Sequence, residues 1–339
     1  MKYLITGGAG FIGSNLAAHF VKAGHSVTVF DNFSRRGSES NLSWLREGLG
    51  DSFAVVRGDI RDAAAIAQSA RGQDVILHMA GQVAVTTSVN DPRLDFESNA
   101  LGTFNVMEAA RAAGTNPIVM YSSTNKVYGG MEEARIGEAN DRYVFADMPN
   151  GVAETWPLDF HSPYGCSKGA GDQYVRDYHR IYGLPTVVFR QSAIYGPRQF
   201  GVEDQGWLAY FAICVTVGRR FTIYGDGKQV RDLLHIDDLV RAYDAAIKNI
   251  DKTAGQVYNI GGGPARSLSV WTETRPLLEG MAGRSLEVNF GDWRPGDQKV
   301  YLSDIRKAKA EFGWEPKIGP AEGMKTLWDW TQANKQLFQ

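Results

Sequence analysis

The sequence of 339 residues contains two cysteines, no excess of basic residues and no long apolar run. Cys166 and Cys214 are too few for a disulfide framework or a cysteine-rich metal site. The formal net charge of −2 argues against a nucleic-acid-binding surface, and no stretch approaches the ~20 apolar residues of a membrane-spanning helix. The first residues do not form a secretory signal. These absences predict a cytoplasmic protein that binds no metal, no nucleic acid and no membrane.

Glycine is abundant by contrast, and three glycines near the N-terminus have a spacing that predicts a ligand. A short apolar run, Lys2–Thr6, is typical of a strand buried on both faces, and Ser14–Lys22 has helical spacing. Between them lie Gly7, Gly10 and Gly13. Glycine permits a tight turn and lets a pyrophosphate approach the positive end of the helix dipole. The pattern predicts a dinucleotide site, with a purely structural turn as the alternative.

Asp31 predicts which dinucleotide binds. It ends a second apolar run about 20 residues after the glycines, where a carboxylate can bind the diol of an adenosine ribose. The same carboxylate repels a 2′-phosphate, which favours NAD over NADP, although Arg35 and Arg36 lie close by and favour the phosphate. The alternative roles for Asp31 are a helix cap or a solvated strand end.

Strands and helices alternate along the first half of the chain. The predicted strands are 2–6, 26–31, 52–57, 74–79, 117–122 and 184–190, and the longer helices are 96–113 and 162–182. This alternation predicts an α/β fold with a doubly wound parallel (Rossmann) sheet. The second half is less regular, with helices at 207–217, 236–248, 270–281 and 321–335 and strands at 221–224 and 257–260.

The irregular second half predicts a smaller α/β domain whose segments interleave with the sheet. We assign residues 1–185 and 232–262 to an NAD-binding domain, and residues 186–231 and 263–339 to a domain that binds the substrate. The segment 129–161 is long for a loop and rich in aromatic residues, so we expect an ordered flap over the site.

A YxxxK pair predicts acid/base chemistry. Tyr164 and Lys168 are four residues apart on a predicted helix and therefore share a face. The unperturbed pKa of tyrosine is about 10. A lysine cation and a positively charged nicotinamide both favour the phenolate, so we expect the pKa of Tyr164 to be lowered. The phenolate can then remove a proton from a hydroxyl group of the substrate.

The glycine turn followed by the YxxxK pair resembles the short-chain dehydrogenase/reductase superfamily, in particular its extended branch that acts on nucleotide sugars. The resemblance implies that Thr124, after Ser122 and Ser123, completes a catalytic set with Tyr164 and Lys168, the alternative being a hydroxyl that caps the turn. It also implies contacts with NAD by residues at the ends of the predicted strands and on two helices: Gly7, Gly10, Phe11, Ile12, Gly13, Asp31, Asn32, Ser34, Arg35, Asp59, Ile60, Ala80, Gly81, Gln82, Asn99, Ser122, Tyr164 and Lys168.

Longer stretches are similar to the CDP-tyvelose 2-epimerases, also called CDP-paratose 2-epimerases. These stretches are 78–88, 122–129, 160–170, 198–200, 204–207 and 225–232. The similarity implies inversion at C2 of a CDP-linked hexose through a 2-keto intermediate, and deoxysugar supply for lipopolysaccharide O-antigen. It implies a homodimer, formed through helices 96–113 and 162–182, or a homotetramer. The implied substrate contacts are Gln82, Thr86, Thr87, Asn125, Gln191, Arg198, Gln205, Trp207, Arg231 and Arg294, the last two as ligands of the diphosphate.

Two alternatives stay open. A UDP-hexose 4-epimerase would use the same cofactor site and the same Tyr164, with the sugar in another orientation. A non-catalytic NAD-binding regulator on this fold is the alternative from another class. A 4,6-dehydratase is disfavoured because Asn125-Lys126 stands where those enzymes have an Asp-Glu pair. Gln191 replaces a histidine of the relatives, so the hexose could be 6-hydroxylated instead of 3,6-dideoxy.

Overall fold

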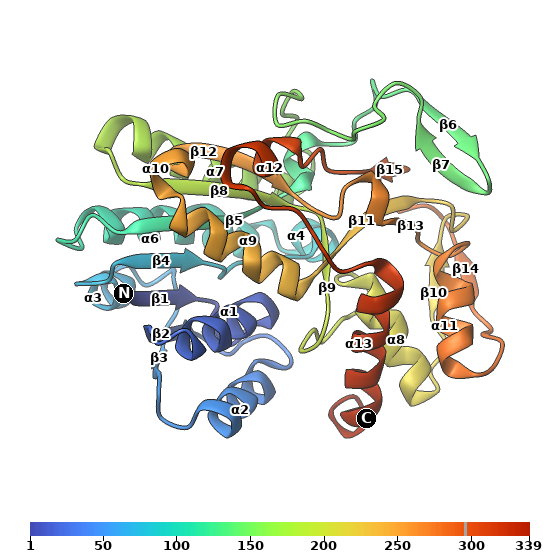
Figure 1. Cartoon of the computed structure of the whole chain (residues 1–339), viewed down its shortest axis with the longest axis horizontal. Coiled ribbons are helices and arrows are strands. Elements are labelled where there is room, and N and C mark those ends of the chain that lie inside the picture. Colours follow the sequence, from blue (N-terminus) through green and yellow to red (C-terminus); the bar gives the residue numbers. More distant parts are fainter. Residues whose placement is uncertain (295–296) are drawn as a thin grey trace.

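A parallel sheet of seven strands forms the centre of the computed structural model, which describes residues 1–294 and 297–339 (Figure 1). The strand order is β3 (Ala54–Arg57), β2 (Ser26–Asp31), β1 (Lys2–Thr6), β4 (Val75–His78), β5 (Ile118–Thr124), β8 (Thr186–Gln191) and β12 (Gln256–Ile260). All neighbouring strands pair in parallel. The chain winds outward in both directions from β1 and β4, and such a switch point opens a crevice at the carboxyl ends of the strands. The predicted doubly wound sheet is confirmed.

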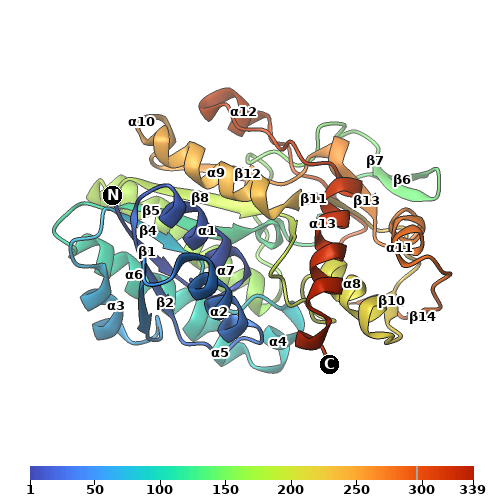
Figure 2. The same cartoon turned by 60° about the horizontal axis from the view of Figure 1, so that its bottom comes forward.

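Helices cover both faces of this sheet (Figures 1 and 2). One face packs against α1 (Phe11–Lys22), α2 (Ser38–Leu49), α9 (Ile236–Lys248) and α12 (Arg306–Phe312). The other face packs against α3 (Ala63–Ala70), α6 (Gly102–Arg111) and α7 (Ser162–Tyr182). Alternate residues of one strand serve the two layers, as Ile5 and Leu4 do in β1. Burial on both faces explains why the strands are continuous apolar runs.

A smaller region lies beside one end of the sheet (Figure 2). Its strands are β9 (Ala193–Tyr195), β10 (Thr222–Tyr224), β11 (Val230–His235), β13 (Ser267–Ser269), β14 (Asn289–Gly291) and β15 (Val300–Tyr301). Its helices are α8 (Trp207–Val217), α11 (Thr274–Ala282) and α13 (Pro320–Ala333). They enclose an aromatic core in which the Phe211 and Phe221 rings stack at 4.5 Å. The chain returns to the sheet for α9, β12 and α12, so the predicted interleaving is present.

Several predicted boundaries were wrong. Residues 186–191 form β8 inside the large sheet, because this fully buried strand pairs with both β5 and β12, so the first boundary assigned at residue 185 is misplaced. The predicted helix 96–113 begins earlier, at α5 (Pro92–Phe96), and continues through a π-helical turn (Glu97–Leu101) into α6. Asp91 caps α5 and Pro92 occupies its first turn, a start signal that we overlooked. The predicted helix 270–281 begins at Thr274.

The segment 129–161 does not cover the site as predicted. It contains the hairpin β6 (Ile136–Ala139) and β7 (Arg142–Phe145), and its apolar residues pack against Tyr301. Its two ends, Gly129 and His161, line a cavity described below. The remaining short elements are η2 (Asn125–Tyr128), α4 (Val85–Asn90), α10 (Ile250–Thr253), η3 (Pro264–Arg266) and η4 (Lys335–Leu337). Within the described residues, no helix has the length and apolar character needed to cross a bilayer.

Candidate active site

The turn between β1 and α1 requires glycine at two of the three predicted positions. Gly7 has φ +66°, and a Cβ there would lie 2.7 Å from the backbone nitrogen of Ala80. A Cβ on Gly13 would lie 2.1 Å from the carbonyl oxygen of Gly7. The turn is therefore closed on itself, and the N-terminal amides of α1 face the crevice at the carboxyl ends of the strands. Such amides favour an anionic ligand.

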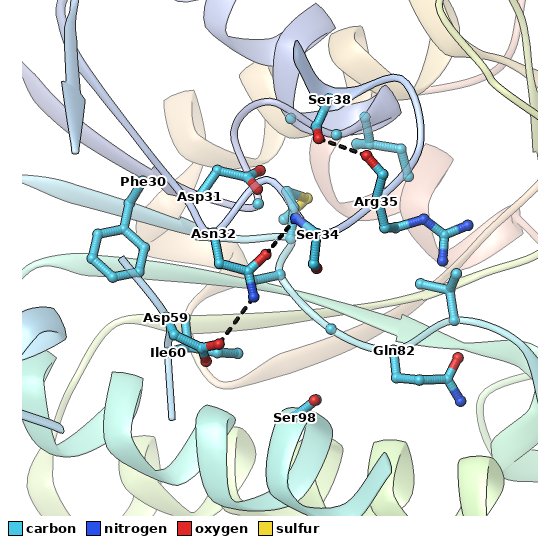
Figure 3. Close-up of a pocket in the computed structure, with 18 of the residues that line it drawn as sticks. Phe30, Asp31, Asn32, Ser34, Arg35, Ser38, Asp59, Ile60, Gln82 and Ser98 are labelled. Carbon is cyan, nitrogen blue, oxygen red and sulfur yellow. Dashed lines mark hydrogen bonds between the residues drawn. The ribbon is translucent and has the colours of Figure 1, made fainter. Parts of the chain in front are cut away.

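Asp31 lies at the end of β2 and is held by the backbone. Its carboxylate accepts hydrogen bonds from the amides of Ala9 (2.9 Å) and Phe33 (2.8 Å). Burial raises the pKa of Asp31, and these two amide hydrogen bonds oppose the rise. Next to it, Asn32 donates to Asp59 at 2.9 Å (Figure 3). Backbone amides and Asn32 thus hold the two carboxylates that would contact an adenosine.

These residues line a cavity of about 350 Å³, here called the cofactor cavity. In Figure 3, Asp59 and Ile60 lie at one end of it and Arg35 and Gln82 at the other. Of the predicted NAD contacts, the following line it: Gly7, Gly10, Phe11, Ile12, Gly13, Asp31, Asn32, Ser34, Arg35, Asp59, Ile60, Ala80, Gly81 and Gln82. Further lining residues that the sequence analysis did not predict include Ser38, Arg61, Met79, Val83 and Ser98, and Gln205, predicted as a substrate contact, also lines the cavity. Most of these are chain neighbours of predicted residues, so the strand ends could have indicated them.

Asn99 does not line this cavity but lies behind it. It is 1% exposed, and its Nδ2 donates to Asp95 (3.1 Å) and Ser167 (3.1 Å). Its Oδ1 has no hydrogen-bond partner among the described residues and lies 2.6 Å from where a Cβ of Gly81 would be. The closed glycine turn and the Asp31 carboxylate, which do line the cavity, fit a dinucleotide.

The three predicted catalytic residues meet in a second cavity of about 310 Å³, here called the sugar cavity. Thr124 ends β5, and Tyr164 and Lys168 lie one helical turn apart on α7. Ser122, predicted to contact the cofactor, also lines this cavity, and its carbonyl accepts from Nζ of Lys168 at 2.5 Å. The sugar cavity shares the lining residues Phe11, Ile12, Met79, Gly81, Val83 and Gln205 with the cofactor cavity. A hydroxyl of a bound sugar can therefore lie close to both the cofactor and Tyr164.

Burial opposes the ionisation of Tyr164, an effect that the prediction of a lowered pKa did not include. Burial raises the pKa of Tyr164 to about 12, while a hydrogen bond with Thr124 and the charge of Arg35 act in the opposite direction. Burial lowers the pKa of Lys168 to about 8, against the influence of Asp95 and Asp172. The sequence pattern could not reveal this result, because the burial of the phenol arises from long-range packing.

A third cavity of about 390 Å³ opens from the sugar cavity and is here called the nucleotide cavity. Arg231 lines both cavities and forms an ion pair with Asp297 at 2.7 Å. Arg294 lines the nucleotide cavity, lies 3.9 Å over the ring of Tyr224 and pairs with Asp204 at 3.3 Å. The two arginines are therefore together in one cavity, and each already has a carboxylate partner.

The other predicted substrate contacts divide into two groups. Asn125 and Gln191 line the sugar cavity, Thr86 lines the nucleotide cavity, and Gln205 and Trp207 line both. Oγ1 of Thr86 is buried without a hydrogen-bond partner among the described residues.

Three predicted contacts lie elsewhere. Thr87 is exposed and does not line these cavities. The Arg198 guanidinium packs over Trp44 at 4.5 Å and Trp330 at 5.8 Å, and the backbone at residue 198 is left-handed. Gln82 lines the cofactor cavity and donates to Asp95 at 2.9 Å.

A hydrogen bond connects the cofactor cavity with the segment that lines the nucleotide cavity. Nη2 of Arg35 donates to Oε1 of Gln205 at 3.0 Å. Arg35 belongs to the loop after β2, whereas Gln205 belongs to the segment before α8 and lines all three cavities. The neighbours of Gln205 in this segment contact the nucleotide side, where Glu203 accepts from the Tyr224 hydroxyl at 2.7 Å.

Comparison with known proteins gives consistent results. A family model described as GDP-mannose 4,6 dehydratase matches residues 4–327. The CDP-paratose 2-epimerase of Salmonella typhi is 46% identical over 98% of this chain and 100% of the relative. The UDP-glucose 4-epimerase of Mycolicibacterium smegmatis is 35% identical over 96% of each chain. A solved dTDP-glucose 4,6-dehydratase from Streptomyces venezuelae, with NAD and TYD bound, has a TM-score of 0.84 and 30% identity, over 99% of this chain and 98% of that chain.

Proposed function

Because this chain belongs to the GDP-mannose 4,6 dehydratase family of extended short-chain dehydrogenases/reductases, we propose that it inverts C2 of a CDP-linked hexose, of the CDP-paratose to CDP-tyvelose type. The protein is an NAD-dependent nucleotide-sugar epimerase of deoxysugar biosynthesis. The choice of C2 and of a CDP-linked sugar is supported by the 46% identity to the Salmonella typhi enzyme. O-antigen supply and a cytoplasmic location remain predictions from the sequence.

The observation that carries the proposal is the position of Thr124, Tyr164 and Lys168. They line a sugar cavity that joins the cofactor cavity on one side and the nucleotide cavity on the other. The glycine turn and Asp31 would hold the pyrophosphate and the adenosine ribose of NAD. When bound, NAD supplies a hydride acceptor that can also return the hydride.

The proton steps belong to residues of the chain. The positive charges of Lys168 and of a bound nicotinamide would favour the phenolate of Tyr164 against the effect of burial. This phenolate removes the proton of the C2 hydroxyl as this carbon is oxidised, while Thr124 donates a hydrogen bond to the same oxygen. Lys168, held by Ser122, keeps a positive charge beside the reaction. The 2-keto sugar then turns in the cavity while Arg231 and Arg294 hold the nucleotide. Tyr164 returns the proton to the oxygen when C2 is reduced from its other face.

Proton NMR of the purified chain tests the proposal directly. CDP-paratose, CDP-glucose and UDP-glucose are incubated separately with the protein, and no cofactor is added. A new spin system inverted at C2 of a CDP-linked sugar is expected, and the sugar that reacts identifies the substrate. Inversion at C4 of UDP-glucose would instead identify a 4-epimerase. No reaction in any tube, even after addition of NAD, would contradict the proposal.

The assignment of Tyr164 as acid and base predicts a specific variant. Tyr164→Phe keeps the ring but removes the hydroxyl, so turnover should fall by about 10²–10⁴-fold while CDP affinity stays within a factor of about three. Turnover is measured from quenched reaction samples, and CDP affinity is measured by calorimetric titration. Near-normal turnover in this variant would show that Tyr164 is not the acid and base of the reaction.

We also infer a homodimer as the basic assembly. Large apolar side chains are exposed on the neighbouring segments 92–111 and 162–182: Phe96, Leu101, Phe104, Tyr174, Ile181 and Tyr182. Ile181 is 65% exposed and Phe96 59%, and a second copy of the same surface would cover them. Light scattering after size exclusion should give twice the monomer mass, or four times for a homotetramer. A monomer mass would contradict the inference.

A further inference from the structure

The sugar cavity and the nucleotide cavity share a wall, and two cations belong to it. Among the described residues, Lys126 and Arg231 are the lysine and the arginine that line both cavities. A nucleotide sugar that fills both cavities must pass its diphosphate through this shared part, because the diphosphate connects the sugar to the nucleoside. Lys126 therefore lies where a diphosphate has to pass.

Lys126 is fixed to the catalytic residues by its backbone. Its amide donates to Oγ1 of Thr124 at 3.2 Å, and it belongs to η2, the turn that Thr124 caps. Its carbonyl lies 3.3 Å from where a Cβ of Gly165 would be, and Gly165 follows Tyr164 directly. The lysine side chain thus starts beside the reacting centre and reaches the wall between the cavities.

Lys126 keeps its positive charge in this position. Burial and the charge of Arg231 together lower its pKa to about 8, and Asp297 acts in the opposite direction. A value near 8 keeps most of the lysine protonated at pH 7. Two neighbouring cations stabilise a bound diphosphate. Without the diphosphate, the two cations repel each other.

The identity of the reacting carbon decides how near the diphosphate comes to Tyr164. In a hexopyranose, C1 carries the diphosphate and is bonded to C2, whereas C4 lies opposite C1 in the ring. If C2 lies at Tyr164, the β-phosphate is therefore close to the catalytic residues. If C4 lies at Tyr164, the whole width of the sugar ring separates the β-phosphate from them. A cation two residues after Thr124 suits the first orientation.

We propose that Lys126 binds the β-phosphate of the nucleotide sugar and, as a positioning residue, orients the ring with C2 at Tyr164. This inference rests on the proposed function, because it takes C2 as the reacting carbon. It gives a physical reason for the Asn125-Lys126 pair that stands where dehydratases have Asp-Glu. A carboxylate at position 126 would repel a phosphate in this orientation.

Calorimetric titration of the NAD-containing protein with CDP and with CMP tests the phosphate contact. Lys126→Met keeps the length of the side chain but removes the charge. It should weaken CDP binding by about 10–100-fold and CMP binding by less than about threefold, because CMP lacks the β-phosphate. Lys126→Arg should restore CDP affinity to within about fivefold, which a purely structural role of the lysine would not predict. Should Lys126→Met not fold, Lys126→Gln provides the second neutral variant.

A matched control and a separate activity assay complete the test. Lys228 pairs with Glu138 outside the cavities, so Lys228→Met should leave the affinities for CDP and CMP unchanged. Unchanged CDP affinity in Lys126→Met, or equal losses for CDP and CMP, would overturn the proposal. Absence of C2 inversion by the unchanged chain would overturn the proposed function, whereas the phosphate contact is decided by the titrations alone.

Discussion

The cofactor cavity and the nucleotide cavity are built in different ways. The cofactor cavity is formed mainly by the ends of β1, β2, β3 and β4 and by the few residues that follow each of them. The nucleotide cavity combines α4, η2, α8, β10, β11 and the loops around Glu203 and Arg294, which are distant in sequence. One cavity is therefore encoded locally, and the other depends on the packing of the smaller region against the sheet.

The two cavities also differ in how they receive negative charge. In the cofactor cavity, the closed glycine turn and the first amides of α1 lie where the pyrophosphate of NAD would bind. In the nucleotide cavity, Arg231 and Arg294 are already paired with Asp297 and Asp204. A diphosphate must replace or share these carboxylates, so part of its attraction is offset on binding. We conclude that cofactor binding depends mostly on shape and substrate binding mostly on charge.

The largest expected effect concerns shape. In Gly13→Ala, the new Cβ would lie 2.1 Å from the carbonyl oxygen of Gly7, so the turn must open. We expect the free energy of unfolding to fall by about 3–5 kcal/mol and most of the bound NAD to be lost. Denaturant titration and the NAD content of the purified protein measure both. Gly48→Ala is the control, since a Cβ there meets no atom within 4 Å and should stabilise α2 by about 0.5–1 kcal/mol. Similar behaviour of the two variants would contradict the argument.

The second effect appears as the pH is lowered. His78 ends β4 beneath the cofactor cavity, is completely buried, and contacts the hydroxyls of Thr6 (2.8 Å) and Thr103 (3.0 Å). Burial lowers its pKa to about 3, and the charge of Lys168 contributes. The unfolded chain has the ordinary value of about 6.5 and takes up a proton below it, so stability is present above pH 6.5 and is lost as the pH falls towards 3.

Denaturant titrations at pH 8 and pH 5 measure this loss. His78 should account for about 2 kcal/mol of the difference between the two pH values, as an order of magnitude. His78→Asn should therefore lose less stability than the unchanged protein over this interval, even if it is less stable at pH 8. His161→Asn, at an exposed histidine, serves as control and should keep the original slope. Equal slopes in all three proteins would contradict the role of His78.

The third effect concerns charge. Arg231→Met should weaken CDP binding by about tenfold but leave the NAD content unchanged, because the cofactor cavity does not include Arg231. A tenfold loss of affinity is small for a charged hydrogen bond, because CDP binding to Arg231 also weakens its ion pair with Asp297. Arg142→Met removes another ion pair, with Glu273, outside both cavities and should change neither property. Loss of NAD in Arg231→Met would show that the two cavities do not depend on separate interactions.

The difference between a cavity encoded by local segments and one that depends on long-range packing also decided how much of the site could be predicted from the sequence. The glycine turn and Asp31 were found because their chemistry lies within single loops, and Tyr164 and Lys168 because one helix places them together. Thr87 and Arg198 were misplaced, because the direction of a side chain depends on packing and on a left-handed residue that the sequence does not mark. The strand β11, which carries Arg231, was missed for a similar reason: it pairs with the distant strands β9, β13 and β15.

The smallest expected effect concerns the contact that joins the two cavities. Arg35 and Gln205 are partly solvent-exposed, so their 3.0 Å hydrogen bond should contribute only about 1 kcal/mol. Since Gln205 lines all three cavities, CDP should slow the release of NAD from the unchanged protein, and Gln205→Ala should reduce this slowing by about three- to fivefold. Release is measured by exchange against labelled NAD, with and without CDP. Arg36→Met, next to Arg35 but outside the cavity, is the control. Equal slowing by CDP in all three proteins would mean that the cavities act independently despite this bond.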